Sequence, residues 1–115
     1  MTSHTARTLG YLRRRGFLVE VVEKYIRTPQ GGFRRDLFKV ADLVAIDPEQ
    51  SGVLFVQVCR TDDIQAHLEK LRSEKIWPNV QRVLKAGNRV SVMAWALRGA
   101  AGKRKRYTLT TVPVE

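Results

Sequence analysis

The stretch "FRRDLFKVADLVAIDPEQSGVLFVQVCR", residues 33–60, contains two strand-like runs on either side of a turn. Both "FRRDLFKVADLVAID", residues 33–47, and "VLFVQVCR", residues 53–60, are rich in β-branched and aromatic residues. The segment "PEQSG" between them has the composition of a turn. The second run is the most continuously apolar in the chain, which predicts a strand near the centre of a sheet.

Acidic side chains interrupt the first of these runs. Side chains alternate along a strand, so a strand at 33–47 would carry Asp36 and Asp42 on one face. An antiparallel neighbour at 53–60 would bring Gln57 beside Asp42. A buried carboxylate without a partner is costly. Either an arginine such as Arg35 neutralises Asp42, or Asp42 belongs to a binding site.

Oxygen ligands at this place would suit a hard divalent cation. Asp42, Gln57 and Asp36 are the predicted ligands, and Glu20 or Glu23 is available from the preceding strand. Magnesium prefers such oxygen clusters, and manganese is the alternative ion. A phosphodiester is the expected substrate, because the ion activates water and stabilises developing negative charge.

The remainder of the chain predicts one α/β domain, residues 1–115. The expected elements are a helix at 3–15, strands at 17–26, 33–47 and 53–60, a helix at 61–76, and strands at 89–97 and 107–114. This order, α-β-β-β-α-β-β, predicts a mixed sheet of about five strands flanked by helices. The third and fourth strands are joined through a helix and are expected to be parallel, with a right-handed crossover.

The charge of the chain predicts a polyanionic partner. The formal net charge is +10, with 21 Lys and Arg against 11 Asp and Glu. The predicted nucleic-acid-binding residues fall in three clusters, which are Arg13, Arg14 and Arg15; Arg34 and Arg35; and Lys103, Arg104, Lys105 and Arg106. Contacts of this kind reach phosphates rather than bases, so recognition by shape is expected. The alternative is that these residues only form a solvated face.

Other classes are less well supported by the sequence. A membrane surface is the rival polyanion, but no run approaches about 18 apolar residues, and the N-terminus lacks the apolar core of a signal peptide. An intracellular protein without a membrane partner is expected. The single cysteine, Cys59, excludes an internal disulfide and a zinc site built of cysteines.

"ADLVAI" followed after a turn by "VLFVQVC", within this order of elements, resembles the PD-(D/E)XK nuclease superfamily. Within it, the sequence is most similar to the Holliday junction resolvase-like proteins of archaea and phages. The resemblance implies a restriction-endonuclease-like fold over about residues 5–97. It also implies a metal-dependent endonuclease that cuts branched DNA as a homodimer, with Asp42 as the first metal-binding aspartate.

The second half of the family's motif differs in this sequence. Gln57 stands where the family has Asp or Glu, and Cys59 stands where it has Lys. The resemblance therefore implies that another residue supplies the catalytic ammonium group. Lys70 in the helix at 61–76 is the first candidate, with His67 on the same face. The first helix also lacks the family's glutamate, and Glu20 or its neighbour Glu23 would replace it.

Two alternatives remain open at the level of sequence. The fold and the basic surface could persist in a protein that only binds branched DNA or RNA, for which Gln57 and Cys59 are the evidence. The chain could instead be a small structural protein that binds an acidic partner. Asp42 in an apolar run argues against this last reading.

Overall fold

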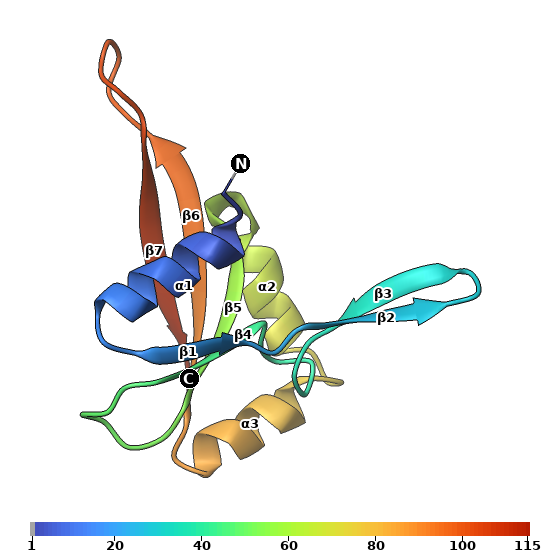
Figure 1. Ribbon diagram of the computed structural model, residues 1–115. Coiled ribbons are helices and arrows are strands. Elements are labelled where there is room, and N and C mark those ends of the chain that lie inside the picture. The colour runs from blue at the N-terminus through green and yellow to red at the C-terminus, as the bar shows by residue number, and fades with distance from the viewer. Residues whose placement is uncertain (1) are drawn as a thin grey trace.

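The computed structural model describes residues 2–115, which form a mixed α/β structure (Figure 1). In chain order the elements are α1 (His4–Arg14), β1 (Leu18–Val21), β2 (Lys24–Thr28), β3 (Gly31–Arg35), β4 (Leu43–Ile46), β5 (Leu54–Arg60), a 3-10 turn η1 (Thr61–Asp63), α2 (Ile64–Leu71), α3 (Trp77–Lys85), β6 (Arg89–Arg98) and β7 (Arg106–Val114).

The main sheet has five strands in the order β1-β4-β5-β6-β7, and β2 and β3 form a separate two-stranded sheet. The pairs β1–β4, β4–β5 and β6–β7 are antiparallel, whereas β5 and β6 are parallel. The expected class, a mixed sheet of about five strands with helices, is confirmed. The predicted parallel pairing across the helical connection is confirmed as well.

Helices cover both faces of this sheet (Figure 1). Successive residues of β5 point to opposite faces, as the strand period requires. Leu54 and Val56 pack with Leu12 of α1 in one apolar cluster. Phe55 and Cys59 pack in the other cluster, with the buried residues of α2 and α3. The strand predicted to be central is therefore buried on both faces.

The expected continuous strand at 33–47 is wrong. Between β3 and β4 the chain forms a tight loop, residues 36–41. The backbone reverses there because Phe38 and Lys39 both adopt left-handed conformations, with φ of 55° and 62°. Side chains in this loop do not alternate, so the predicted shared face of Asp36 and Asp42 does not exist in that form.

The expected strand at 17–26 is also divided. β1 joins the main sheet through β4, and the chain then leaves that sheet as the β2–β3 hairpin, which projects from the body of the molecule (Figure 1). The break falls at Val22 and Glu23, whose N–H groups both donate to the carbonyl oxygen of Asp42. These bonds end the pairing of β1 and turn the chain outward.

The helical connection differs from the single predicted helix at 61–76. The α-helical part of that segment ends at Leu71, and a second helix, α3, follows from Trp77. The helix α3 is not among the elements expected from the sequence, although Pro78 in its first turn is a usual signal of a helix start.

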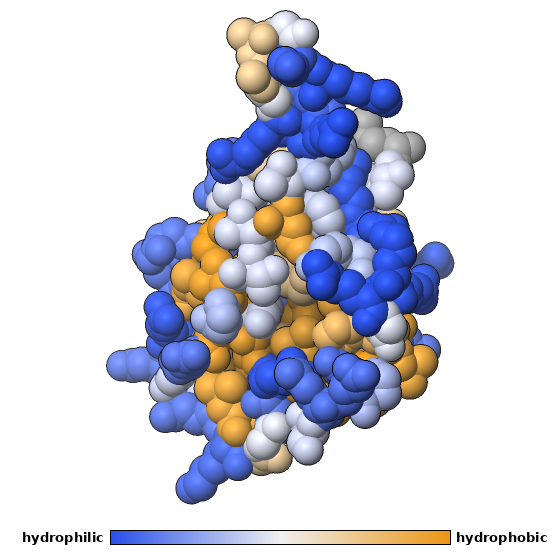
Figure 2. Space-filling model, turned by 90° about the vertical axis from the view of Figure 1, so that its left-hand side faces the viewer, coloured by the Kyte–Doolittle hydropathy of each residue, from blue (hydrophilic) through white to orange (hydrophobic). Residues whose placement is uncertain are grey.

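The molecule is extended by its two hairpins. Its radius of gyration is 15.2 Å, whereas a compact chain of this length has about 13 Å. The β6–β7 hairpin forms a strongly hydrophilic projection, and apolar surface gathers lower on the same face (Figure 2). None of the helices in residues 2–115 has the length and apolar character needed to span a membrane.

Candidate functional site

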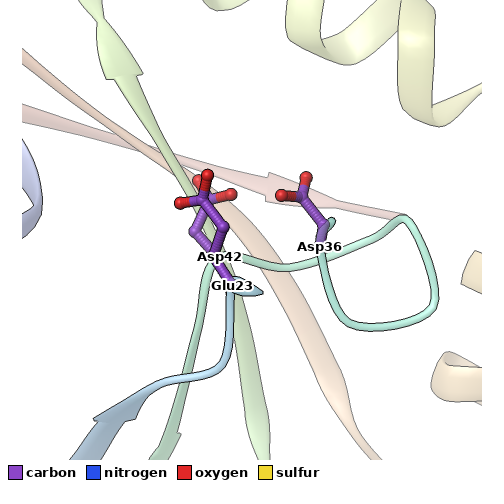
Figure 3. Close-up of side chains that lie close together, drawn as sticks. All are labelled: Glu23, Asp36 and Asp42. Atoms are coloured by element: carbon purple, nitrogen blue, oxygen red, sulfur yellow. The ribbon is translucent and has the colours of Figure 1, made fainter. Parts of the chain in front are cut away.

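Three carboxylates, Glu23, Asp36 and Asp42, converge at one place (Figure 3). One oxygen atom from each lies within 4.8 Å of the others. Glu23 comes from the turn between β1 and β2, Asp36 follows β3, and Asp42 precedes β4. We refer to these three residues as the carboxylate cluster.

Backbone hydrogen bonds fix Asp42 at the junction of three strands. Its N–H donates to the carbonyl oxygen of Val56 at 2.8 Å, and its own carbonyl accepts from Val22 and Glu23 at 2.9 and 3.2 Å. Its carboxylate Oδ2 accepts from the N–H of Val58 at 2.8 Å. Only 9% of the residue is exposed, so the carboxylate has little freedom to move.

The electrostatic environment of Asp42 disfavours its charge. Burial raises the pKa of this carboxyl from 3.8 to about 7, and the negative charges of Asp36 and Glu23 act in the same direction. The hydrogen bond from Val58 opposes this shift. Ionisation of Asp42 would therefore add a third negative charge to the cluster, and a bound divalent cation would stabilise that charge.

Gln57 supports the carboxylate cluster from β5. Its Nε2 donates to Asp36 Oδ2 at 2.9 Å and to the carbonyl oxygen of Val40 at 2.7 Å. Since a carbonyl can only accept, the amide nitrogen must face Val40, and Gln57 Oε1 must face His67. Gln57, predicted as a ligand, thus presents its nitrogen to the cluster, and an amide NH₂ does not bind magnesium.

His67 completes this network from α2. Its Nδ1 lies 2.9 Å from Gln57 Oε1 and must donate to it. Burial lowers the pKa of His67, and Lys70 adds to this effect, whereas Asp63 and Asp36 oppose it. The neutral ring therefore keeps its lone pair on Nε2. The signal for His67 in the sequence was its spacing of three residues from Lys70 on one helix.

Lys70, the predicted stand-in for the family's lysine, reaches the cluster. Its Nζ lies 3.5 Å from Asp36 Oδ2. A second cation, Arg34, lies 3.6 Å from Glu23 through its guanidinium. The cluster is thus flanked by an ammonium group on one acid and a guanidinium on another.

Two candidate residues lie apart from this arrangement. Glu20, predicted as catalytic, is exposed on β1 and does not belong to the cluster, whereas its alternative Glu23 does. Cys59 is buried, and burial raises the pKa of its thiol to about 11, with Asp63 and Asp42 adding to the shift. Cys59 therefore remains a neutral thiol near pH 7.

The predicted basic clusters occupy separate places. Arg13, Arg14 and Arg15 are exposed at the end of α1, and Lys103 to Arg106 are exposed at the tip of the β6–β7 hairpin. Arg34 and Arg35 end β3 and directly precede Asp36. Only this last pair adjoins the carboxylate cluster in the chain.

The sequence matches no protein-family model and no curated protein.

Proposed function

We propose that this protein is a metal-dependent endonuclease that hydrolyses phosphodiester bonds in branched DNA. The observation that supports it most is the convergence of Glu23, Asp36 and Asp42 beside Lys70. Three segments that are apart in sequence supply the acids, and each is positioned by the break between the main sheet and the β2–β3 hairpin.

The donor set of the cluster fits Mg²⁺ or Mn²⁺. Both ions prefer carboxylate oxygens and retain several waters, and three acids in one place provide that chemistry. The raised pKa of Asp42 also fits, because a bound cation would favour the ionised carboxylate. When bound, the ion would lower the pKa of a water nucleophile and stabilise the charge that develops on the phosphate.

The other residues have roles that follow from their contacts. Lys70 carries a positive charge on the cluster and is suited to hold a phosphate oxygen or the attacking water. Gln57 orients the carboxylate of Asp36 through its amide nitrogen. His67 in turn orients Gln57.

We further propose a restriction-endonuclease-like fold for this chain. In support, Asp42 precedes β4 and its neighbour in the sheet, β5, carries Gln57, which is the relation expected for the PD-(D/E)XK motif. A lysine on the following helix would take the role that Cys59 cannot perform. Two symmetric cuts across a four-way junction require two such sites, so we propose a homodimer.

The test is cleavage of a labelled four-way DNA junction with Mg²⁺ or Mn²⁺. The wild type is expected to cut the junction in preference to a linear duplex of the same sequence. Asp42→Asn is expected to abolish cutting, whereas Glu20→Gln, a matched loss of an exposed acid outside the cluster, is expected to preserve it. Cutting that survives Asp42→Asn would rule out this site.

The second candidate is a protein that binds branched DNA or RNA without cutting it. The engagement of Gln57 with Val40 and His67 favours it, because that side chain leaves the cluster with one oxygen ligand fewer than the resemblance implies. Binding of the junction by the wild type, with no product in either metal, would select this candidate.

A further inference from the structure

A groove separates the β2–β3 hairpin from the loop at 36–41 and the segment before α3. It encloses about 500 Å³. We call it the hairpin groove and define it by Lys24, Ile26, Arg35, Phe38, Lys39 and Lys75. Asp36 of the carboxylate cluster lines it too, so the groove and the candidate site share this residue.

The charge of the hairpin groove is strongly positive. Lys24, Arg35, Lys39 and Lys75 line it, and Asp36 is its single acid. Asp36 already contacts Lys70 and Gln57. Within residues 2–115, none of the four cations forms an ion pair.

One pair of these cations is held together by the fold. Lys24 and Arg35 are direct partners in the register of β2 and β3. Like charges at directly opposed positions destabilise a sheet. An anion between them would remove this repulsion, and a phosphate in the groove would have that position.

An exposed aromatic residue, Phe38, lines the groove. Phe38 is 59% exposed, although its ring lies near that of Phe55. Its φ of 55° and that of Lys39, 62°, are unfavourable for side chains with a Cβ. Such strain persists only where the surroundings enforce it, and it is concentrated at functional sites.

Hydrogen bonds hold the loop in this strained form. Asn79 of α3 donates from Nδ2 to the carbonyl oxygen of Phe38 at 2.9 Å. Within the loop, the N–H of Val40 donates to Leu37 at 2.9 Å, and that of Leu37 donates to Ala41 at 2.9 Å. The ring is thus presented to solvent on a fixed support.

We propose that the hairpin groove binds an unpaired nucleic-acid strand. Its phosphates contact the four cations, and one base stacks on Phe38. Bases in a duplex have their faces covered by neighbouring pairs, so an exposed ring can stack only on an unpaired nucleotide. This proposal rests on the proposed function in one respect: the strand passes Asp36 and so delivers a phosphodiester to the carboxylate cluster.

The test is binding of a fluorescein-labelled DNA strand of about 12 nucleotides, which lies within the roughly 4–16 that such sites cover. Anisotropy is measured in EDTA, so that no cutting occurs. The wild type is expected to bind the strand more tightly than a duplex of the same sequence. Phe38→Gly is expected to weaken strand binding about tenfold, as removal of one stacked base would do. An abasic strand is expected to bind both proteins equally.

Matched variants separate the groove from general effects. Tyr25 is equally exposed on the hairpin but does not line the groove, so Tyr25→Ala is expected to bind as the wild type does. The double variant Lys39→Ala/Lys75→Ala is expected to weaken binding of both the intact and the abasic strand. Lys85→Ala on the exposed face of α3 is the control. Phe38→Gly removes a strained Cβ, so its thermal midpoint is not expected to fall far.

Failure of this proposal differs from failure of the proposed function. Tighter binding of the duplex than of the strand would overturn the proposal that the hairpin groove binds an unpaired strand. Equally weakened binding in Phe38→Gly and Tyr25→Ala would overturn it as well. Junction cutting that does not depend on Phe38 would support the nuclease proposal and contradict delivery of the strand through the groove. Strand binding that depends on Phe38, in a protein that cuts no DNA, would support the groove proposal and contradict the nuclease proposal.

Discussion

Asp42 is held firmly in a place where its own charge is unfavourable. Backbone groups of β5 and of the turn after β1 fix its position, while Asp36 and Glu23 bring two further negative charges to it. Such a conflict between structure and charge is concentrated at functional sites. It also has a measurable effect on stability.

The free energy of unfolding is expected to fall as pH rises from about 4 to 7 in the absence of divalent ions. Across this window folded Asp42, with a pKa of about 7, holds a proton that the unfolded chain releases near 3.8. The decrease is at most about 4 kcal/mol, at roughly 1.4 kcal/mol per pKa unit. Urea unfolding in EDTA at pH 4 and pH 8 measures most of this decrease.

Asp42→Asn is the control for this prediction. An amide oxygen can still accept from Val58, but it carries no charge. The variant is expected to be more stable than the wild type at pH 8. His67, whose pKa is lowered, contributes the opposite slope below about 6.5 in both proteins, so it cancels in the difference. Equal pH slopes in the two proteins would show that Asp42 is not the group responsible.

Divalent ions are expected to restore the stability that the folded protein loses as pH rises. A cation that binds the folded carboxylate cluster stabilises it in proportion to ln(1 + [ion]/Kd). The thermal midpoint of the wild type at pH 8 is therefore expected to rise with Mn²⁺ or Mg²⁺, and that of Asp42→Asn to respond weakly. A wild-type midpoint that is flat across millimolar Mn²⁺ would exclude a metal site here.

Placing at position 57 the acid that the PD-(D/E)XK resemblance implies is expected to destabilise this protein. In Gln57→Glu a carboxylate oxygen would face the carbonyl of Val40 and the acid of Asp36 without a hydrogen to donate. An unsatisfied buried group of this kind costs about 1–3 kcal/mol. Urea unfolding at pH 8 tests this, with Gln81→Glu on the exposed face of α3 as the control. Equal stability of Gln57→Glu and the wild type would contradict the hydrogen-bond network.

At the scale of elements, the β2–β3 hairpin begins and ends at the carboxylate cluster. Glu23 directly precedes β2, and Asp36 directly follows β3. Anything that binds along the hairpin is thereby placed next to two of the three acids. The like-charged pair Lys24 and Arg35 lies at this same end of the hairpin, next to the cluster.

Lys24→Glu is expected to stabilise the hairpin and weaken nucleic-acid binding at once. The change converts an opposed like pair into an opposite pair, worth roughly 0.2–1 kcal/mol in a sheet. Hydrogen exchange of the hairpin amides reports the first effect, and anisotropy with the labelled strand reports the second. If both quantities fell together, simple unfolding of the hairpin would be the cause.

Elements with regular periodicity could be predicted from the sequence, and those with unusual backbone geometry could not. The β-branched run of β5 and the helical stripe of α1 indicated their positions closely. The loop at 36–41 was missed, because Phe38 and Lys39 adopt positive φ without being glycine and carry no turn signal. The same loop decides how Asp36 meets Asp42, so the cluster was predicted in part for a wrong reason.

For Lys70, by contrast, the resemblance identified a residue that does reach the cluster. The resemblance implied that Lys70 brings an ammonium group to the site, and its Nζ does lie 3.5 Å from Asp36, one of the predicted ligands. Glu20 and Glu23 were both candidates from the first strand, and Glu20 was named as catalytic, yet β1 ends at Val21 and the turn beyond it carries the acid that joins the cluster. Where a strand ends is set by long-range pairing, which local periodicity does not contain.

At the scale of the whole molecule, positive charge is carried by structures that project. The tip of the β6–β7 hairpin, a hydrophilic projection in Figure 2, bears Lys103, Arg104, Lys105 and Arg106 in the sequence, and the β2–β3 hairpin bears Arg34 and Arg35. Two projecting hairpins of this kind spread the positive charge of a small protein over a longer distance.

Neutralising the β6–β7 tip is expected to weaken DNA binding without changing preference for any sequence. Substituting residues 103–106 with serine removes four positive charges from this tip and leaves Arg98, the partner of Arg106 in the register of β6 and β7. The slope of log K against log salt concentration should become shallower by about 0.7–0.9 for each phosphate that is no longer neutralised. Titrations at several salt concentrations measure this, and an unchanged slope would show that the tip does not touch phosphates.

The buried thiol of Cys59 makes this protein a convenient reporter of its own opening. With its pKa raised to about 11 and its sulfur enclosed between β5 and the helices, it should react with thiol reagents only when that layer separates. Because Cys59 is the sole cysteine in the chain, the labelling rate reports the opening of this one part of the structure. That rate, followed with and without Mn²⁺ or a DNA strand, would measure how strongly each ligand restrains the fluctuations of the fold.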